Sequence, residues 1–318
     1  MPNTNVVVLE GGYNEEHEVS LLTAKEVKKA ILELGYNLGS IEVNPKDFYK
    51  KIKKFNADIY FNALHGPFGE DGKIQQILFD NKIKFSHSGV RASSIAFDKN
   101  LTKEAIKNTE IKCPDSIVFK KSDLKKKVLE EFYEKYGSII LKPVSSGSSY
   151  GVKLIKSPED IKLLFRNKFE LKKLYENHHN LMIEPYIEGK ELTVAVVEEG
   201  QASRAIEVTE IISKNFFFDY AAKYTKGFSQ HILPAEIPSQ IYRECLNNAK
   251  AVHDILGCRG VSRSDFLYDE KNNIIYFLEI NTQPGLTPIS LVPEQLNYNN
   301  IGFTTLIDNL LKSSLCQK

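Results

Sequence analysis

Hydrophobic residues recur with two alternating spacings along the first ninety residues. Residues 5–10 form a short apolar run that ends at two glycines, which predicts a buried strand. Residues 16–34 carry apolar side chains at helical spacing and stop at Gly35, a typical C-cap residue, so they predict a helix. Residues 59–64 predict a second strand, and residues 73–79 a second helix. This alternation indicates a small parallel sheet with helices on its faces.

The pattern changes from about residue 99. Two predicted strands, 139–142 and 152–155, flank the loop PVSSGSSYG, and strand–loop–strand indicates a hairpin. The run KKSDLKKKVLEEFYEKYG from Lys120 mixes both signs of charge on an amphipathic pattern, which favours a solvated helix face over a phosphate-binding patch. The later predicted elements are a helix at 240–256, a strand hairpin at 260–268 and 274–281, and a helix at 304–311.

Composition excludes several classes of protein. A chain of 318 residues has room for two or three domains, and its 42 basic and 41 acidic residues leave a net charge of +1. An extended nucleic-acid track needs a basic excess, and a disordered chain has few apolar residues, whereas here 42% are hydrophobic. The sequence has no membrane-span run and its first apolar run is too short for a signal peptide, so we expect a cytoplasmic protein. The four scattered cysteines are interpreted as reduced structural thiols.

The late hairpin is the most informative feature. Because side chains alternate faces along a strand, Arg263 and Asp265 share one face, and Phe277, Glu279 and Asn281 share a face of the second strand. Folding the hairpin brings the two sets opposite each other. Oxygen ligands without histidine or cysteine suit Mg²⁺ that shares its shell with phosphate, and the arginine would face the anion. The alternative is an ordinary ion pair of the arginine with either carboxylate at a sheet edge.

Lys142 and the loop at 145–151 form a second candidate site. Small residues let backbone N–H groups approach a phosphate, and the lysine at the strand end adds positive charge. The P-loop pattern is absent and the loop leads into a strand, so a hairpin that closes over a nucleotide fits better than a helix N-terminus. An ordinary serine–glycine turn remains the alternative.

The stretch HGPFGEDG follows a predicted strand and precedes a predicted helix. Its glycines are spaced G-x-x-G-x-x-G, and Glu70 and Asp71 would repel a pyrophosphate, which excludes a Rossmann dinucleotide site. His65, just before the first glycine, is either a buried structural histidine or a polar group at the mouth of a cleft.

Two further stretches leave alternatives open. Glu184 and Glu191 flank a break at Gly189, and this segment is either an adenosine cradle between domains or a pair of exposed glutamates. Lys223 and Tyr224 lie in FDYAAKYTKG, which is either an active-site loop or an exposed hinge.

Eight motifs in order carry a family resemblance: GGYNEEHEVSL, ALHGPFGEDG, FDK, LKPVSSGSSYGV, IEPYIEGKELTV, AAKY, SRSDFLY and LEINTQPGLTPISLVP. Together they resemble the D-alanine–D-alanine ligase family of the ATP-grasp superfamily, from about residue 6 to residue 305. The resemblance implies an α/β, three-domain ATP-grasp fold: an N-terminal parallel-sheet βαβ domain (1–90) and two α+β domains (91–186 and 187–318) that clamp ATP. It also implies D-alanine as substrate and a homodimer, and composition gives no reason to expect nucleic acid or a membrane as partner.

The resemblance also implies roles for individual residues. Glu16, linked to Ser148 and Tyr224, would orient the first D-alanine through its ammonium group, with His65 as a further substrate contact. The other matched sets are the phosphate-contacting lysines Lys99, Lys142 and Lys223; the adenine and ribose contacts Glu184, Pro185 to Ile187 (backbone) and Glu191; the ligands of two Mg²⁺ ions (Mn²⁺ as an alternative) Asp265, Glu279 and Asn281; the oxyanion-stabilising Arg263 and backbone amide of Gly285; and Ser290 and Leu291, which would hold the carboxylate of the second D-alanine.

The chain departs from the family pattern in the loops around these residues. The departures are Asn14, His87, Ser145, Ser146, Tyr150 and Ala221, and they bear on loop geometry and nucleotide closure rather than on the reaction class.

Two alternatives to D-alanine ligation stay open at this point. One keeps the fold and changes the acceptor, giving a D-alanine–D-lactate or D-serine ligase or another carboxylate–amine ligase; Tyr224 argues against the lactate form. The other is a non-catalytic nucleotide-binding protein, which the intact charged residues of the hairpin and Lys142 argue against.

Overall fold

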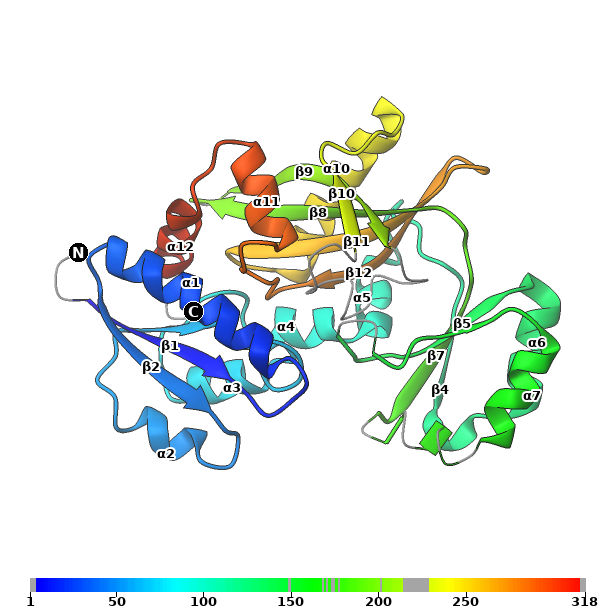
Figure 1. The fold of residues 1–318 in the computed structure, drawn as a ribbon, viewed down its shortest axis with the longest axis horizontal. Helices are drawn as coiled ribbons and strands as arrows, with labels where there is room; N and C mark the ends of the chain where they lie inside the picture. The colour runs from blue at the N-terminus through cyan, green and yellow to red at the C-terminus, as the bar shows by residue number, and fades with distance from the viewer. Residues whose placement is uncertain are drawn as a thin grey trace.

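The chain folds around three β-sheets that lie beside one another (Figure 1). The computed structural model describes residues 4–147, 150–167, 169, 171–172, 175–176, 178–200, 202–213 and 229–314. The structure confirms the predicted mixed α/β fold, with one parallel sheet followed by two antiparallel sheets.

The N-terminal sheet is parallel, as predicted, with the strand order β2-β1-β3. Its elements are β1 (Asn5–Gly11), α1 (His17–Glu33), β2 (Asn37–Val43), α2 (Phe48–Ile52), β3 (Ile59–Asn62) and α3 (Lys73–Asp80). The sequence did not predict β2 or α2. In β2 only Ile41 and Val43 are buried, so the edge strand shows too little alternation to be recognised.

The central sheet is antiparallel, with the order β4-β7-β5-β6. Its elements are β4 (Ile117–Lys120), η1 (Lys121–Asp123), α6 (Lys126–Tyr136), β5 (Ile139–Pro143), β6 (Lys153–Ile155), α7 (Pro158–Arg166) and β7 (Asn180–Pro185). The predicted β5–β6 hairpin is confirmed. So is the solvated helix face, because Lys126 pairs with Glu130 at 2.6 Å on the outside of α6 while Leu129 and Phe132 are buried beneath.

The third sheet has the order β10-β9-β8-β11-β12 and is antiparallel throughout. Its strands are β8 (Lys190–Glu199), β9 (Ala202–Ser213), β10 (Ser229–Ile232), β11 (Val261–Asp269) and β12 (Ile274–Asn281). The helices around it are α4 (Val90–Phe97), α5 (Lys99–Ile106), α10 (Ser239–Leu256), α11 (Leu291–Tyr298) and α12 (Phe303–Lys312). Helices α4 and α5 pack on α10 and β12, so they contribute to the core of this sheet.

The end of the chain packs against its beginning. Helix α12 lies on α1, and Ile307 and Leu310 share one buried cluster with Val27 and Ala30. The same cluster includes Val197 of β8, so the N-terminal and third sheets are joined by a continuous apolar core. The end of β3 lies beside the end of β12, where Gln283 donates to the carbonyl oxygen of Asn62 at 2.8 Å.

The register of the late hairpin corrects one prediction. The polar residues of the two strands lie opposite each other, as expected from folding the hairpin, with Arg263 paired with Asn281 and Asp265 with Glu279. A β-bulge follows, however, and Phe277 lies in the hydrophobic core with its ring against Phe266. The prediction that Phe277 shares the face of the polar residues is therefore wrong, because the extra residue in β12 reverses the alternation of faces.

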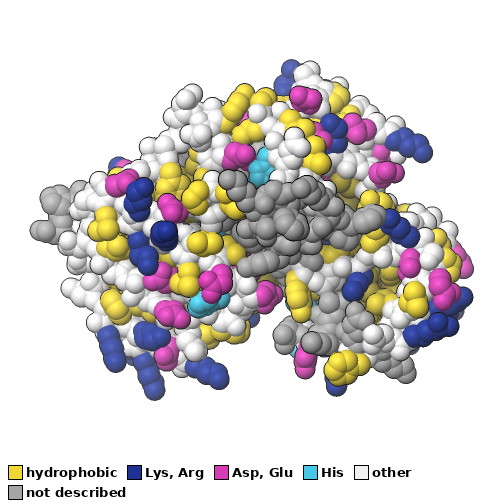
Figure 2. Space-filling view, viewed as in Figure 1, with side chains coloured by type: hydrophobic (Ala, Val, Ile, Leu, Met, Phe, Trp, Pro, Cys, Tyr) yellow, Lys and Arg dark blue, Asp and Glu magenta, His cyan; other side chains and the backbone are white. Residues whose placement is uncertain are grey.

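The surface carries both signs of charge. On the face in Figure 2, basic and acidic side chains are interspersed over the described part of the molecule, which fits the nearly equal totals of 42 and 41. Among the described residues, no helix combines the length and apolar character needed to cross a bilayer.

Candidate active site

Two connected cavities lie where the three sheets meet. An outer cleft of about 250 Å³ opens between the central and third sheets, and an inner cavity of about 50 Å³ lies between the N-terminal and third sheets. Lys99, Ser146 and Glu279 line both. The candidate residues on the outer cleft are Lys99, Lys142, Glu184, Pro185, Ile187, Glu191, Asp265 and Glu279. Those on the inner cavity are Glu16, His65, Lys99, Arg263, Glu279, Asn281 and Gly285.

The hairpin strands present their charged residues between the two cavities. Arg263 donates from Nε to Oδ1 of Asp265 at 2.9 Å and from Nη2 to Oδ2 at 2.7 Å. Thr193 on the neighbouring strand β8 donates to Oδ1 of Asp265 at 2.6 Å, which fixes the carboxylate further. The ion pair considered as an alternative for this hairpin thus exists, but it runs along one strand and is mostly buried, with Arg263 only 8% exposed.

Lys99 connects the β11–β12 hairpin to Ser146, which lies in the serine-rich loop at 145–151. Its Nζ lies 3.0 Å from Oε2 of Glu279 and donates to the carbonyl oxygen of Ser146, also at 3.0 Å. Lys99 opens helix α5, where Asp98 caps the helix by accepting from the backbone N–H of Leu101. The lysine is buried and held from two sides, so its charge points at the junction of the cavities.

The carboxylates of the hairpin form a donor set that fits magnesium. Asp265 and Glu279 lie directly opposite each other, and Asn281 adds a carboxamide oxygen at the cavity edge. Two carboxylates and one carboxamide would leave the rest of a cation's coordination shell to water or phosphate oxygens. This is how Mg²⁺ is usually bound in proteins.

Glu184 is buried between two lysines at the other end of the outer cleft. Lys103 contacts its Oε1 and Lys142 contacts its Oε2, while Lys103 also donates to the carbonyl oxygen of Pro114 at 2.8 Å. Burial alone would raise the pKa of the Glu184 carboxyl, but Lys142 and Lys103 hold that pKa below its usual value. Glu184 is therefore not the exposed glutamate considered as an alternative, since only 4% of it is accessible.

The chain passes from the central sheet to the third sheet beside Glu184. Strand β7 ends at Pro185 and β8 begins at Lys190, so the intervening residues form the wall between the two sheets. Gly189 is required there because a Cβ at this position would lie 2.2 Å from the carbonyl oxygen of Tyr268. Glu191 lies on the same wall of the cleft.

Glu16 lies at the start of helix α1 and faces the inner cavity. Asn14 accepts from the backbone N–H of Glu16 at 2.8 Å and donates to the carbonyl oxygens of His65 and Pro67 at 2.9 and 3.1 Å. The Glu16 side chain is only 5% exposed, and its Oε1 lies 3.5 Å from where a Cβ on Gly147 would be. Asn14, a departure from the family pattern, thus fixes the glutamate against the serine-rich loop.

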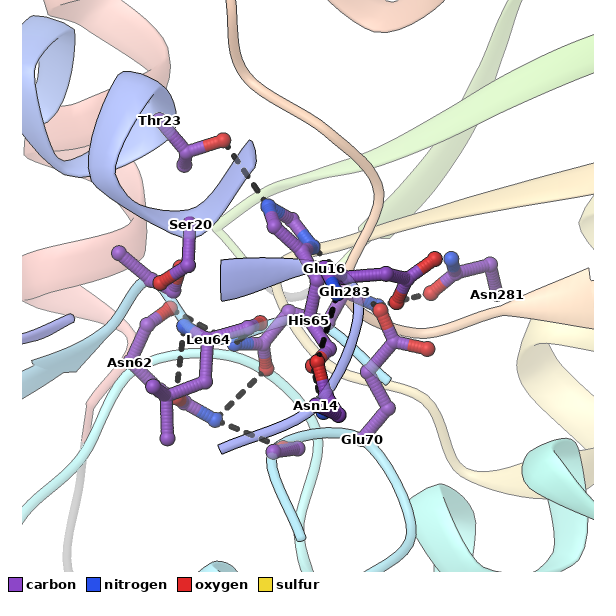
Figure 3. A network of polar contacts seen from close by, with 12 residues as sticks. Asn14, Glu16, Ser20, Thr23, Asn62, Leu64, His65, Glu70, Asn281 and Gln283 are labelled. Atoms are coloured by element: carbon purple, nitrogen blue, oxygen red, sulfur yellow. Dashed lines mark hydrogen bonds and ion pairs between the residues drawn. The ribbon is translucent and has the colours of Figure 1, made fainter. Parts of the chain in front are cut away.

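His65 lies in a buried chain of polar contacts (Figure 3). Its Nε2 is 2.9 Å from Oγ1 of Thr23 in α1, and its Nδ1 is 3.4 Å from Oε1 of Glu70. The sequence left two interpretations of His65, a buried histidine or a polar group at a cleft, and the structure shows features of both. His65 is 3% exposed, yet it lines the inner cavity.

A reciprocal pair of amide side chains connects the N-terminal sheet to the end of β12 (Figure 3). Gln283 donates from Nε2 to the carbonyl oxygens of Asn62 and Leu64 at 2.8 and 3.0 Å, and its Oε1 accepts from Nδ2 of Asn62 at 2.9 Å. The backbone N–H of Gln283 donates to Oδ1 of Asn281 at 2.6 Å. These bonds set the position of the hairpin residues relative to Glu16 and His65.

The last predicted residues lie behind the inner cavity or outside the described part of the chain. Gly285 lines the cavity, and Ser290 lies behind it, with Oγ 2.9 Å from where a Cβ on Gly285 would be. Ser290 is the N-cap residue that precedes α11 and accepts from the backbone N–H of Thr287 at 3.1 Å, whereas Leu291 packs against Ile211. Ser148, Lys223 and Tyr224 lie outside the described residues, as does Ala221 among the departures.

Two other residues that depart from the family pattern, Tyr150 and His87, can be placed in the structure. Tyr150 lines the outer cleft. His87 is buried with a φ of 68°, and its Nδ1 lies 2.8 Å from Oγ of Ser86. Burial lowers the pKa of His87 to about 3, and His65 and Arg259 add to the effect, so this histidine is neutral.

Four residues that contact the site were not predicted from the sequence: Lys103, Thr193, Asn62 and Gln283. Lys103 follows Lys99 by four residues in a helix, so the two share a face, and this spacing could have identified it. Asn62 and Gln283 are polar residues where a strand ends or has just ended, a weaker signal. The position of Thr193 depends on strand pairing alone.

Gly66 allows the Glu16 carboxylate to approach the backbone, which leads to a first prediction. Its φ is +70°, and a Cβ would lie 2.7 Å from Oε2 of Glu16. Gly66→Ala should displace Glu16 and reduce turnover at least about tenfold, besides a backbone cost of about 1 kcal/mol. Gly200→Ala is the matched control, because Gly200 has the same φ but no atom within 4 Å of its Cβ position. Equal effects of both on activity would argue against the contact with Glu16.

The chain is similar to a known protein family over most of its length. The family model described as "D-ala D-ala ligase C-terminus" matches residues 105–312. A protein of Wolbachia pipientis wMel named D-alanine–D-alanine ligase is 41% identical over 314 residues, covering 98% of this chain and 95% of its own. The crystal structure of D-alanine–D-alanine ligase from Bacillus anthracis has 30% identity and a TM-score of 0.81, covering 98% of this chain and 97% of its own. The structure of the Bacillus anthracis ligase complexed with ATP has 29% identity and a TM-score of 0.80, covering 99% and 97%.

Proposed function

The chain belongs to the D-alanine–D-alanine ligase family, and we propose that it uses ATP to join two D-alanine molecules into D-alanyl-D-alanine, releasing ADP and phosphate. The observation that carries the proposal is the inner cavity. It is lined by Glu16 and Glu70 together with Arg263 and Lys99, which present both signs of charge within one small space. Such a cavity suits a zwitterionic amino acid next to a phosphoryl group.

The nucleotide is proposed to lie in the outer cleft. Its base would contact Glu184 and the backbone of residues 185–187, with Glu191 near the ribose and Lys142 and Lys99 near the phosphates. A similar structure from Bacillus anthracis is described as complexed with ATP, which supports this assignment. The γ-phosphate would then point toward the junction where Lys99 and Glu279 line both cavities.

Asp265, Glu279 and Asn281 are the residues proposed to hold two Mg²⁺ ions, for which Mn²⁺ is an alternative. When bound, the ions would neutralise the charge of the phosphates. In the structure, the carboxylates of this set are held by cationic side chains, Asp265 by Arg263 and Glu279 by Lys99.

Activation of the first D-alanine is the first step of the proposed reaction. A carboxylate oxygen of this substrate attacks the γ-phosphorus, the bond to the bridging oxygen breaks, and ADP leaves with that electron pair. Glu16 would hold the ammonium group of this substrate, and Lys99 would offset the negative charge where two anions meet. The product is an acyl phosphate.

Peptide bond formation follows. The amine of the second D-alanine, which has lost one proton before attack, adds to the acyl carbon and gives a tetrahedral oxyanion. Arg263 and the backbone N–H of Gly285 would stabilise that oxyanion from the cavity wall. The C–O bond to phosphate then breaks, and the amine loses its second proton. Ser290 and Leu291, behind Gly285, are proposed to position the carboxylate of this second substrate.

The proposal makes a direct prediction for the purified protein. Incubation with ATP, Mg²⁺ and D-alanine should release ADP and phosphate in a 1:1 ratio with dipeptide, measured by coupled ADP detection and mass spectrometry. The same assay with D-serine and D-lactate as acceptors tests the alternatives within the fold. Folded protein that binds ATP but makes no dipeptide would contradict the proposal, and faster product formation with D-lactate than with D-alanine at neutral pH would reassign the acceptor.

The finer assignments follow from the family resemblance. We propose a cytoplasmic homodimer that supplies D-alanyl-D-alanine for peptidoglycan synthesis and so contributes to cell wall formation and cell shape. The assignment of Ser148, Lys223 and Tyr224 to the closing loops is also a proposal. Ser148 and Tyr224 would support Glu16, and Lys223 would approach the phosphates.

A further inference from the structure

Lys103 and Lys142 divide the Glu184 carboxylate between them, one oxygen each. Lys142 lies on β5 and contacts Oε2, while Lys103 reaches Oε1 from helix α5. The lysines are 12% and 10% exposed and Glu184 is 5% exposed at the side chain, so all three groups are shielded from water. A buried carboxylate in this position needs a permanent counter-ion to remain charged.

The two lysines differ in what else they can contact. Lys142 lines the outer cleft beside Ser146 and Pro143 and is the lysine proposed to meet phosphates. Lys103 does not line the cleft among its described residues; it is anchored at the back by the carbonyl oxygen of Pro114 at 2.8 Å. A bound triphosphate therefore competes with Glu184 for Lys142 but leaves Lys103 in place.

Helix α5 relates the two ends of the proposed nucleotide site. Lys99 and Lys103 are four residues apart, so they lie on one face of the helix about 6 Å apart along its axis. Lys99 contacts Glu279 at the phosphate end, and Lys103 contacts Glu184 at the base end. The helix itself packs on α10 and β12 of the third sheet, so Lys103 also bridges that sheet to β7 of the central sheet.

We propose that Lys103 is a positioning residue for recognition of the nucleotide base: it holds Oε1 of Glu184 so that Oε2 can accept from an exocyclic amine once Lys142 turns to the phosphates. This inference rests on the proposed function, because it assumes that a nucleotide occupies the outer cleft. In the structure Oε2 of Glu184 is contacted by the ammonium group of Lys142, so that lysine and the exocyclic amine would use the same carboxylate oxygen. Phosphate binding and base binding are thereby coupled through one lysine.

The charge state of Glu184 gives the proposal a measurable signature. The titratable groups that face Glu184 are Lys103 on α5, Lys142 on β5 and the half-buried thiol of Cys113 before β4. With both lysines present, the pKa of Glu184 is below its usual value, and the carboxylate stays ionised at neutral pH. Without Lys103, and with Lys142 on the phosphates, burial is the remaining influence and it raises the pKa of Glu184. Base recognition should then weaken as the pH falls.

The test compares the full-length parent protein with Lys103→Met by calorimetric titration with ATP and with ITP, each with Mg²⁺. ITP carries a carbonyl in place of the exocyclic amine, so the ratio of the two affinities reports recognition of the base. Protonation of the triphosphate affects both nucleotides equally and therefore does not change this ratio. We expect Lys103→Met to lose between about tenfold and a hundredfold in ATP affinity, and its ATP/ITP ratio to approach one. Between about pH 8 and pH 5 any residual ratio should decline in the variant and stay constant in the parent.

Two further variants complete the experiment. Lys107→Met is the matched control, because Lys107 lies one turn further along and pairs only with Glu104 on the surface at 2.7 Å in the described contacts. Lys103→Arg keeps the charge and should keep the ATP/ITP ratio, so a folded arginine variant that loses the ratio would overturn the proposal even if Lys103→Met does not fold. A Lys103→Met protein with the parent ratio and pH profile would overturn it as well. Failure of the parent to bind ATP would instead remove the proposed function itself.

Discussion

Arg263→Ala should lower the turnover number by about two to three orders of magnitude while leaving ATP binding close to that of the parent. The expected loss follows from the position of Arg263 on the inner cavity, where it is 8% exposed and separated from the proposed base contacts. A guanidinium preorganised by two bonds to Asp265 needs little rearrangement to stabilise an oxyanion. Single-turnover dipeptide formation and calorimetric ATP titration measure the two properties separately.

Two variants control for effects other than oxyanion stabilisation. Arg204→Ala removes an arginine of the same sheet that is 49% exposed and pairs with Glu199 on the surface, so its turnover should equal that of the parent. Arg263→Lys keeps the charge without the planar fork and should recover only part of the activity. Parent-like dipeptide formation by Arg263→Ala would exclude the proposed oxyanion role, and a large loss of ATP affinity would assign Arg263 to the nucleotide instead.

The late hairpin could be predicted because its information is local. Strand alternation and a turn of five polar residues are enough to bring the polar ends of the two strands roughly opposite each other, whereas the exact pairs, Asp265 with Glu279 and Arg263 with Asn281, depend on the bulge. The bulge that places Phe277 in the core could not be predicted, because it lies in the apolar run of β12 without a glycine to mark it. The local sequence pattern thus shows that the two strands pair, whereas the one extra residue in β12 determines on which face of the sheet a side chain lies.

The surroundings of Glu184 show the opposite case. Its nearest partners are Lys142, on the adjacent strand, and Lys103, which is 81 residues away in the chain. The spacing of charges around Glu184 left an exposed position as likely as a cradle, because burial of a carboxylate depends on counter-ions supplied by distant elements. The family resemblance identified Glu184 and Lys142 as candidates but not Lys103, whose contact with Glu184 depends on how α5 is placed in the folded chain.

Gln283→Met should lower the free energy of unfolding by about 2–4 kcal/mol, although methionine matches glutamine closely in volume. Gln283 is 2% exposed, and its amide satisfies the carbonyl oxygens of Asn62 and Leu64 and one proton of the Asn62 amide. The thioether cannot donate, so two buried carbonyl oxygens lose a partner in a region closed to water. Equilibrium denaturant unfolding of parent and variant measures this loss of free energy, and both proteins should show the same m-value.

The same substitution should also reduce activity, because the amide pair does more than stabilise a core. Gln283 bonds to Asn281 through its backbone and to Asn62 through its side chain, so it links the hairpin residues to the sheet that carries Glu16 and His65. If this link sets the width of the inner cavity, Gln283→Met should raise the KM for D-alanine more than the KM for ATP, whose proposed cleft lies on the other side of Glu279. Gln76→Met is the control, since Gln76 is exposed and bonds only to Asp80 at 2.7 Å in the described contacts. A parent-like D-alanine KM together with the expected loss of stability would show that the amide pair is structural and that another contact sets the cavity.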